Sequence, residues 1–335
     1  MVIRLHLNEV PFPPSPLVGE YLREYSKVIN RYSYEELMHE LLNEVSKYTG
    51  IDENNLSIYP SSSEILITAL KYVAKRNLRF LMMRPSFHAV YEFAELENVK
   101  VYTSNLNPPE FVLDSDKLLN TIDSRTVLYI SNPNNPTSNI LLRDKGLIEE
   151  LCRHVHMLIL DEAYYEFSGI TFIDLIETSC NNLIIVRTFS KAFALAGARI
   201  GYLASSREIV EKLNKLRPLF DVPIPSMAAA LAALHDLSYM RKIVNNVKKL
   251  RDKLAKDIKG HIGLNVLPSA TNFLFIKLPL SGEYIAKKLK ERNILTMYFK
   301  DPIIRNYLRA SIGTENENKI FIEELKRILE NIKPS

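Results

Sequence analysis

Short apolar runs alternate with amphipathic segments along the first two thirds of the chain. In the amphipathic segments apolar residues recur every three or four positions, which predicts helices, whereas the apolar runs predict buried strands. We expect strands at 56–59, 78–83, 99–103, 126–131, 156–161, 183–188 and 199–204. Helices are expected near 34–48, 65–73, 89–97, 114–121, 143–153 and 206–217. This alternation is typical of a mostly parallel, seven-stranded sheet that helices cover on both faces.

The pattern changes after a proline-rich stretch at 217–225. A long helix is expected at 226–258, and strands at 272–276 and 307–312 follow with helices at 282–292 and 315–331. We interpret this as an α/β chain with a large domain (31–225), a connecting helix (226–258) and a smaller α+β domain (259–335). Residues 1–30 would form an N-terminal arm and part of the small domain. Prolines at 11, 13, 14 and 16 predict that the arm is extended.

Lys191 follows the apolar strand expected at 183–188. Ligands of open α/β sheets bind beyond the carboxyl ends of the strands, which is where this lysine would lie. Two hydroxyls, on Thr188 and Ser190, precede it, and Arg199 follows eight positions later. An amine in this setting is suited to bond covalently to a carbonyl, beside groups suited to hold a phosphate.

Polar residues also follow other strands of the predicted sheet. Ser61, Ser62 and Ser63 open a helix, where they either cap it or help its free N–H groups bind an anion. Asn135 lies in a segment with two Asn-Pro pairs, which marks a turn but also fixes an amide that could reach a ligand oxygen.

Asp161 ends the apolar strand at 156–161. A carboxylate there needs a partner, which would be an arginine, a protonated ring nitrogen or a metal ion. We do not expect a metal, because no second carboxylate stands at ligand spacing outside this strand end. Asn135, Asp161, Lys191 and Arg199 together predict one site at one edge of the sheet.

Composition narrows the class of protein. The 335 residues carry a net charge of +4, which favours neither a nucleic-acid nor a membrane partner. The two cysteines form no CxxC pair and fit a reducing compartment. No signal-peptide pattern or membrane-length apolar run is present, so we expect a cytoplasmic protein. A dinucleotide-binding dehydrogenase is disfavoured because no G-x-G-x-x-G follows the first strand.

These motifs resemble those of the class I/II aminotransferases, which are fold type I enzymes dependent on pyridoxal 5′-phosphate. Within that family the chain is most similar to the histidinol-phosphate aminotransferases. The resemblance covers nearly the whole chain through Leu5–Pro11, Asn132–Thr137, Asp161–Tyr164, Thr188–Phe193, Leu195–Gly201 and Leu308–Thr314. Three places depart from the family pattern, one of them Asn139, near which a glycine is common. Ser61-Ser62-Ser63-Glu64 replaces Gly-Ala-Asp-Glu, and Phe12 stands where these enzymes often carry a tyrosine.

The resemblance implies roles for individual residues. Lys191, Asp161 and Tyr164 would be catalytic, with Lys191 joined to the cofactor and Asp161 keeping its ring nitrogen protonated. Asn135 and Tyr164 would bind the ring's phenolic oxygen. The other cofactor-binding residues would be Ser62, Ser63, Phe87, Ser190, Arg199 and, from a neighbouring subunit of a homodimer, Tyr32. Substrate-binding residues would be Arg309, Asn8 and Phe12.

The resemblance also implies transamination between an amino acid, best histidinol phosphate, and 2-oxoglutarate. Two alternatives use the same scaffold, namely decarboxylation of an amino acid phosphate such as threonine phosphate, and transamination of aromatic amino acids or aspartate. A non-catalytic ligand-binding module is a third. It is disfavoured because Lys191, Asp161, Asn135 and Arg199 are all present.

Overall fold

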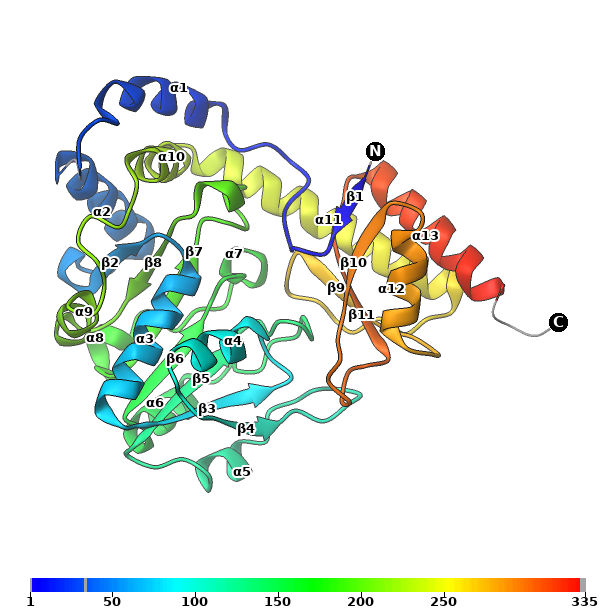
Figure 1. Cartoon of the computed structure of the whole chain (residues 1–335), viewed down its shortest axis with the longest axis horizontal. Helices are drawn as coiled ribbons and strands as arrows, with labels where there is room; N and C mark the ends of the chain where they lie inside the picture. The colour runs from blue at the N-terminus through cyan, green and yellow to red at the C-terminus, as the bar shows by residue number, and fades with distance from the viewer. Residues whose placement is uncertain (1, 33–34, 332–335) are drawn as a thin grey trace.

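A seven-stranded sheet forms the centre of the larger part of the molecule (Figure 1). The computed structural model describes residues 2–32 and 35–331. The strand order is β2-β8-β7-β6-β5-β3-β4, and β8 alone runs antiparallel to both of its neighbours. The bounds are Leu56–Tyr59 (β2), Arg79–Arg84 (β3), Val101–Asn105 (β4), Thr126–Ser131 (β5), Met157–Asp161 (β6), Leu183–Thr188 (β7) and Gly201–Ala204 (β8). The predicted sheet is confirmed. The strands expected from 99 and 199 each start two residues later. For the second, the reason is that Arg199 has a left-handed backbone with φ 51°.

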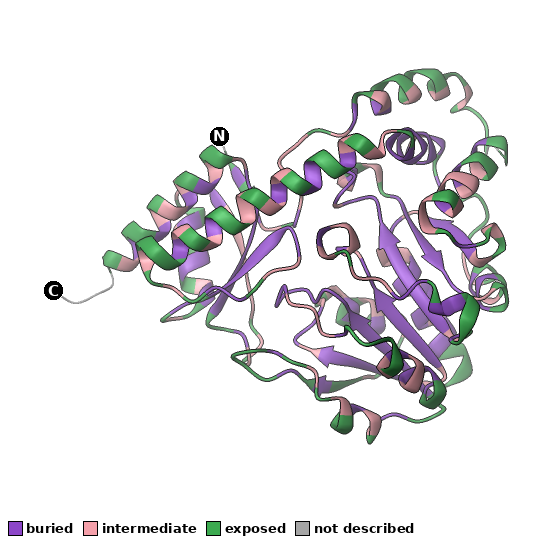
Figure 2. Ribbon diagram, turned by 180° about the vertical axis from the view of Figure 1, so that it is seen from behind, coloured by how far each residue is buried: buried purple, intermediate pink, exposed green. Residues whose placement is uncertain are grey.

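Alternate residues of the central strands enter two different cores, one on each face of the sheet. Ile159 and Ile184 pack beneath α3 (Ser62–Arg76), α4 (Ala89–Leu96) and α9 (Arg207–Asn214). Leu158 and Ile185 pack on the opposite face, which α2 (Glu35–Thr49) and α6 (Lys145–His154) help to cover. The strands are therefore apolar at nearly every position and buried along their length (Figure 2). Helix α2 was expected from residue 34, which lies outside the described residues.

A second, four-stranded sheet has the order β1-β10-β11-β9. Its strands are Ile3–Leu5 (β1), Ile294–Tyr298 (β10), Tyr307–Ser311 (β11) and Phe273–Lys277 (β9), with helices α12 (Gly282–Lys290) and α13 (Glu315–Glu330) beside them. The sequence did not predict β1 or β10. Strand β1 has only three residues, with Arg4 between two apolar ones. Strand β10 is apolar apart from Thr296, so the sequence pattern allowed its prediction although none was made.

Two helices replace the single long helix expected at 226–258. Helix α10 spans Ile224–His235 and α11 spans Leu237–Ile262. Asp236 separates them, with φ −126° and ψ 57°, and its carboxylate accepts a hydrogen bond from the Tyr239 amide at 3.2 Å. Such a cap begins a new helix without interrupting the apolar spacing. Helix α10 is buried almost completely, whereas α11 runs with one face exposed from the large part of the molecule to the small sheet (Figures 1 and 2).

The N-terminal arm is only partly extended. It contains helix α1 (Pro16–Tyr25) and a 3-10 turn, η1 (Ser26–Val28), which the sequence did not predict. Ser15 caps α1 by accepting a hydrogen bond from the Leu17 amide, and Pro16 takes the first helical position, where its missing N–H costs nothing. Ser15 also donates to Asp236 at 2.6 Å, which ties the arm to the α10–α11 junction. Short helices α5 (Ser115–Leu119), α7 (Tyr165–Ser168) and α8 (Leu175–Thr178) complete the fold with the 3-10 turns η2 (Glu53–Asn55) and η3 (Ala196–Ala198).

No helix within the described residues is long and apolar enough to cross a membrane. Among the same residues, no group of three or more His, Cys, Asp or Glu side chains is arranged to hold a metal ion.

The contact between α12 and β11 requires glycine at position 282. A Cβ there would lie 2.3 Å from the Tyr307 carbonyl oxygen. We therefore expect Gly282→Ala to lower the free energy of unfolding by about 2 kcal/mol or more, because the backbone must move to admit the methyl group. The matched change Gly260→Ala in α11 meets no atom within 4 Å and should stabilise the helix by up to about 1 kcal/mol. Urea unfolding measures both variants, and equal effects would contradict the packing argument.

Candidate active site

A cavity of about 440 Å³ lies between the carboxyl ends of the central strands, the arm and the small sheet. It brings together all of the predicted catalytic, cofactor-binding and substrate-binding residues except Tyr32 and Phe12. The residues that line it are Asn8, Ser62, Ser63, Phe87, Asn135, Asp161, Tyr164, Ser190, Lys191, Arg199 and Arg309. Their roles stay predictions, but the strand-end argument that grouped four of them agrees with where the structure places them.

Lys191 reaches the cavity from the loop that follows β7. Its Nζ donates a hydrogen bond to the Leu7 carbonyl of the arm at 3.2 Å. Burial, followed by repulsion from the Arg309 guanidinium, lowers the pKa of Lys191 to about 8. Because only a neutral amine can attack a carbonyl, this lysine is far more nucleophilic near neutral pH than an exposed one.

Asp161 is the last residue of β6 and is buried, with 5% of its surface exposed. Oδ2 accepts a hydrogen bond from the Tyr129 hydroxyl at 2.9 Å, and Oδ1 accepts one from the Ala163 amide at 3.1 Å. Burial raises the pKa of Asp161 to about 6 although these bonds oppose the shift. A protonated nitrogen in the cavity would find here a carboxylate already held in place.

Tyr164 and Asn8 connect the large sheet to the arm. Asn8 Nδ2 donates to the Tyr164 hydroxyl at 2.9 Å, and the Tyr164 ring packs edge-on against Phe273. Burial raises the pKa of Tyr164 to about 12, so its hydroxyl keeps its proton. The Asn8 amide donates to Ser311 and its carbonyl accepts from Asn272, which fixes the arm over the cavity.

Arg309 extends from β11 into the cavity. Nη1 donates to the Asn135 side-chain oxygen at 2.7 Å, and Nη2 donates to the His6 carbonyl at 2.5 Å. Nε is buried and has no hydrogen-bond partner. Burial lowers the pKa of Arg309 to about 10. Because Arg309 has no carboxylate partner among the hydrogen bonds and ion pairs of the described residues, the cavity is suited to an anionic ligand that satisfies Nε.

The start of α3 offers a second region suited to an anion. Ser61 is the N-cap, and its Oγ accepts a hydrogen bond from the Glu64 amide at 3.2 Å. Ser62 and Ser63 lie in the first turn and face the cavity with Ser190 and Arg199. Gly201 permits this approach, because a Cβ there would lie 3.0 Å from the Ser62 nitrogen and 2.6 Å from the Arg187 carbonyl oxygen. Ser61 therefore has the capping role, and the predicted anion role remains open to Ser62 and Ser63.

Tyr32 and Phe12 do not line the cavity. Tyr32 is 83% exposed and its ring packs beside Phe220, whereas Phe12 packs against the core. Sequence reasoning also missed residues of the cavity wall, namely His6, Glu9, His88 and Met297. The arm and the unpredicted strand β10 contribute three of these, so no strand-end pattern could have revealed them. Tyr129 was missed too, although a tyrosine hydroxyl inside an apolar strand is itself a signal.

Comparisons with known proteins give one family. Residues 1–325 match the family model described as aminotransferase class I and II. The histidinol-phosphate aminotransferase of Sulfurisphaera tokodaii is 32% identical over 339 residues, covering 98% of this chain and 91% of that protein. Two solved structures share the fold.

The first solved structure is histidinol-phosphate aminotransferase from Sinorhizobium meliloti in complex with pyridoxal-5′-phosphate, with a TM-score of 0.88 and 23% identity over 99% of this chain and 92% of that one. The second is L-threonine-O-3-phosphate decarboxylase from Porphyromonas gingivalis, with a TM-score of 0.83 and 20% identity over 98% of this chain and all of that one. At these identities the two structures establish the fold alone.

The raised pKa of Asp161 predicts how stability depends on pH. Between pH 4 and pH 6 the folded protein binds this proton more tightly than the unfolded chain, where the pKa is about 3.9. The contribution of Asp161 therefore favours folding at low pH and is lost as the pH rises through about 6, at a cost of about 3 kcal/mol.

Asp161→Asn removes this titration and keeps an oxygen for the Ala163 amide. In urea unfolding of the ligand-free protein, the variant should match the wild type near pH 4 and exceed its stability by about 3 kcal/mol at pH 7.5. A stability difference that does not change with pH would show that Asp161 has an ordinary pKa.

Proposed function

The chain belongs to the class I and II aminotransferases, and from this premise we propose that it transfers the amino group of histidinol phosphate to 2-oxoglutarate with pyridoxal 5′-phosphate as cofactor. The relationship to histidinol-phosphate aminotransferase along 98% of the chain supports this substrate. The observation that carries the proposal is Arg309, a buried guanidinium with a free Nε in the cavity that holds Lys191 and Asp161.

The residues present fit the cofactor. Its phosphate is matched by the N-terminal turn of α3 with Ser62, Ser63, Ser190 and Arg199, its ring nitrogen by Asp161, and its aldehyde by Lys191. When bound, pyridoxal phosphate supplies an electron sink for the pair left behind when the Cα–H bond of the substrate breaks.

The chain's own groups then move and hold protons. We assign the Lys191 ε-amine, with its pKa lowered to about 8, to take the proton from Cα and return it. The Asp161 carboxylate would keep a proton on the ring nitrogen, and the hydrogen bonds from Tyr129 and Ala163 keep that carboxylate in position. The Tyr164 hydroxyl, protonated and fixed by Asn8, would donate to an oxygen of the ring.

Arg309 would serve both halves of the reaction. Histidinol phosphate carries a phosphate ester where an ordinary amino acid carries its α-carboxylate, and 2-oxoglutarate carries a carboxylate there. A guanidinium binds either anion through parallel hydrogen bonds. The imidazole of histidinol phosphate would face the wall of His6, Glu9, His88 and Met297, where the Glu9 carboxylate is an acceptor for a ring N–H.

Because a decarboxylase shares the fold, decarboxylation is the second reaction to be tested. Decarboxylation differs only in which Cα bond lies perpendicular to the cofactor ring. A decarboxylase would release carbon dioxide from threonine phosphate and form no keto acid, so product analysis separates the two reactions.

We further propose that the protein acts as a homodimer. Tyr32, Leu219 and Phe220 form an exposed apolar group in which the Tyr32 and Phe220 rings lie side by side, and Leu219 is 85% exposed. A second copy packed here would bury this group and would explain why Tyr32 does not line the cavity of its own chain.

The first test of function is the visible spectrum of the protein reconstituted with pyridoxal phosphate. We expect one equivalent of histidinol phosphate to bleach the visible absorbance by converting the cofactor to its amine form. Histidinol, which lacks the phosphate, should react roughly 100-fold less efficiently because Arg309 loses two charge-assisted hydrogen bonds. Lys191→Ala should lack the absorbance of the lysine-bound cofactor. If histidinol phosphate leaves the visible absorbance unchanged while threonine phosphate or an aromatic amino acid bleaches it, histidinol phosphate is not the substrate.

Sedimentation velocity tests the dimer. The wild type should sediment as a species of twice the 38.5 kDa chain mass. Leu219→Asp should shift the equilibrium from dimer toward monomer. Leu96→Asp is the matched control, because Leu96 is also highly exposed, on α4. A monomeric wild type, or equal effects of the two variants, would contradict an interface at Leu219.

A further inference from the structure

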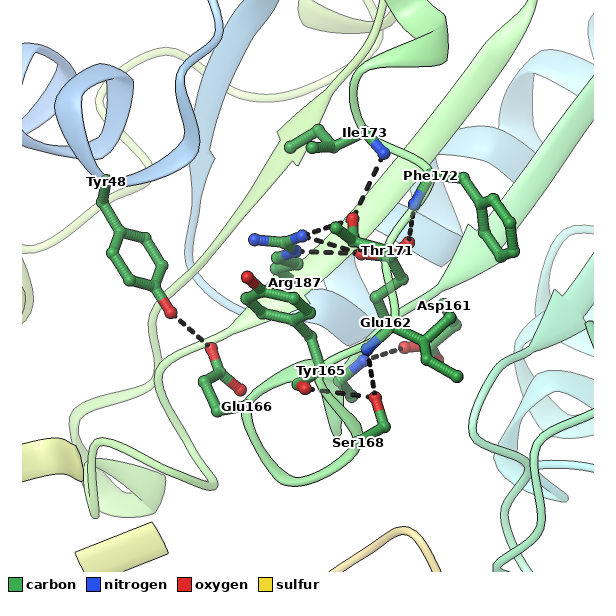
Figure 3. A network of polar contacts seen from close by, with 12 residues as sticks. Tyr48, Asp161, Glu162, Tyr165, Glu166, Ser168, Thr171, Phe172, Ile173 and Arg187 are labelled. Atoms are coloured by element: carbon green, nitrogen blue, oxygen red, sulfur yellow. Dashed lines mark hydrogen bonds and ion pairs between the residues drawn. The ribbon is translucent and has the colours of Figure 1, made fainter. Parts of the chain in front are cut away.

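A buried ion pair lies directly behind the cavity, between the two strands that carry its amine and its carboxylate. Glu162 is the first residue after β6, which ends at Asp161, and Arg187 lies on β7 four residues before Lys191. Arg187 donates from Nε and Nη2 to Glu162 Oε2 at 3.1 and 2.9 Å (Figure 3). Both side chains are buried, with at most 2% of their surface exposed.

The pair is fully hydrogen-bonded by its surroundings. Thr171 accepts from Arg187 Nη2 at 2.7 Å and donates to Glu162 Oε2 at 2.8 Å, while the Phe172 amide donates to Glu162 Oε1 at 3.0 Å. The guanidinium carbon lies 3.8 Å from the centre of the Tyr165 ring. Few alternative arrangements of either side chain would keep all of these contacts.

Other ionisable groups surround Arg187. Tyr48 donates a hydrogen bond to Glu166 at 3.2 Å (Figure 3). Arg187 Nη1 donates to the Tyr202 hydroxyl at 3.4 Å in the same buried region. Burial raises the pKa of Glu166 to about 7. Glu162 is thus the carboxylate that neutralises Arg187 directly.

The position of the pair suggests what it does. The backbone ladder between β6 and β7 ends with Asp161 opposite Val186 and with the Glu162 amide donating to the Val186 carbonyl. β7 continues for two more residues after Val186 and leads to Lys191. The Glu162–Arg187 ion pair joins the ends of β6 and β7 through side chains. A buried ion pair is weak evidence for stability, since apolar residues of similar size often replace one without loss.

We propose that Glu162 and Arg187 are positioning residues that hold the Asp161 carboxylate and the Lys191 amine at the spacing the bound cofactor requires. This inference rests on the proposed function. Neither residue lines the cavity, so they act through the strand ends and not by touching a ligand. Thr171 belongs to the same unit, because it bonds both members of the pair.

Three variants test the proposal. Glu162→Gln leaves Arg187 without its direct counter-charge, and Thr171→Val removes two hydrogen bonds from the pair without changing any charge. Glu324→Gln is the control, because Glu324 pairs with Arg292 at 2.6 Å in the small domain and neither residue lines the cavity. For each variant the dissociation constant for pyridoxal phosphate and the pH midpoint of the bound-cofactor absorbance are measured, with circular dichroism as the check of folding.

We expect Glu162→Gln to weaken cofactor binding roughly 10-fold or more and Thr171→Val about 3- to 10-fold, from the coupling typical of one buried network. Glu162→Gln should also move the pH midpoint downward, because uncompensated positive charge favours deprotonated neighbours. Glu324→Gln should change neither quantity, although it lowers thermal stability. If Glu162→Gln does not fold, the dissociation constant of Thr171→Val for pyridoxal phosphate decides the test.

Wild-type affinity and midpoint in the folded variants would overturn the positioning role, as would an equal loss in Glu324→Gln. Those outcomes leave the proposed function intact. A wild-type protein that binds no pyridoxal phosphate would instead overturn the proposed function together with this inference.

Discussion

The desolvation of charged groups at the carboxyl ends of β6 and β7 is the constraint on which the rest of the structure depends. Two parallel strands that are apolar at nearly every position end here in Asp161 and lead to Lys191, where the sheet can no longer satisfy polar atoms by its own ladder. Every buried charge must therefore find a partner in a side chain, in the backbone of another segment or in a ligand. The pKa values of Asp161 and Lys191 are both displaced toward neutrality by this burial.

The arm and the small sheet close this edge, and they do so with backbone groups. Leu7 accepts from the Lys191 amine, and His6 accepts from Arg309, so the arm is held by the same cations that define the cavity. The pairing of β1 with β10 then anchors the start of the arm in the small sheet. Large-sheet residues supply the groups suited to a cofactor, whereas the arm and small sheet supply Arg309 and most of the wall that a substrate would meet.

How much could be predicted from the sequence depended on whether a feature was local. Most strands of the large sheet were found because each is an apolar run, and β2 and β4 because they mix apolar and polar residues between turns. Asp161 was found because it ends such a run, and Lys191 because it follows one. The break at Asp236 was missed because one capping residue does not disturb helical spacing. Strand β10, in contrast, is apolar apart from Thr296 and could have been predicted from its pattern. Glu9 and Met297 enter the cavity through tertiary pairing alone, and Tyr32 was assigned by resemblance to a role that no contact within one chain could reveal.

The two cations in the cavity also affect each other. Arg309 lies close enough to Lys191 to lower the pKa of its amine, and it has no carboxylate partner among the ion pairs of the described residues. An anion bound at Arg309 removes this repulsion, so the lysine becomes a stronger base when an anionic substrate is in place. Before that, the lower pKa keeps more of the amine neutral and able to attack a carbonyl. One unpaired guanidinium thus makes both the nucleophilic and the basic state of Lys191 accessible near neutral pH.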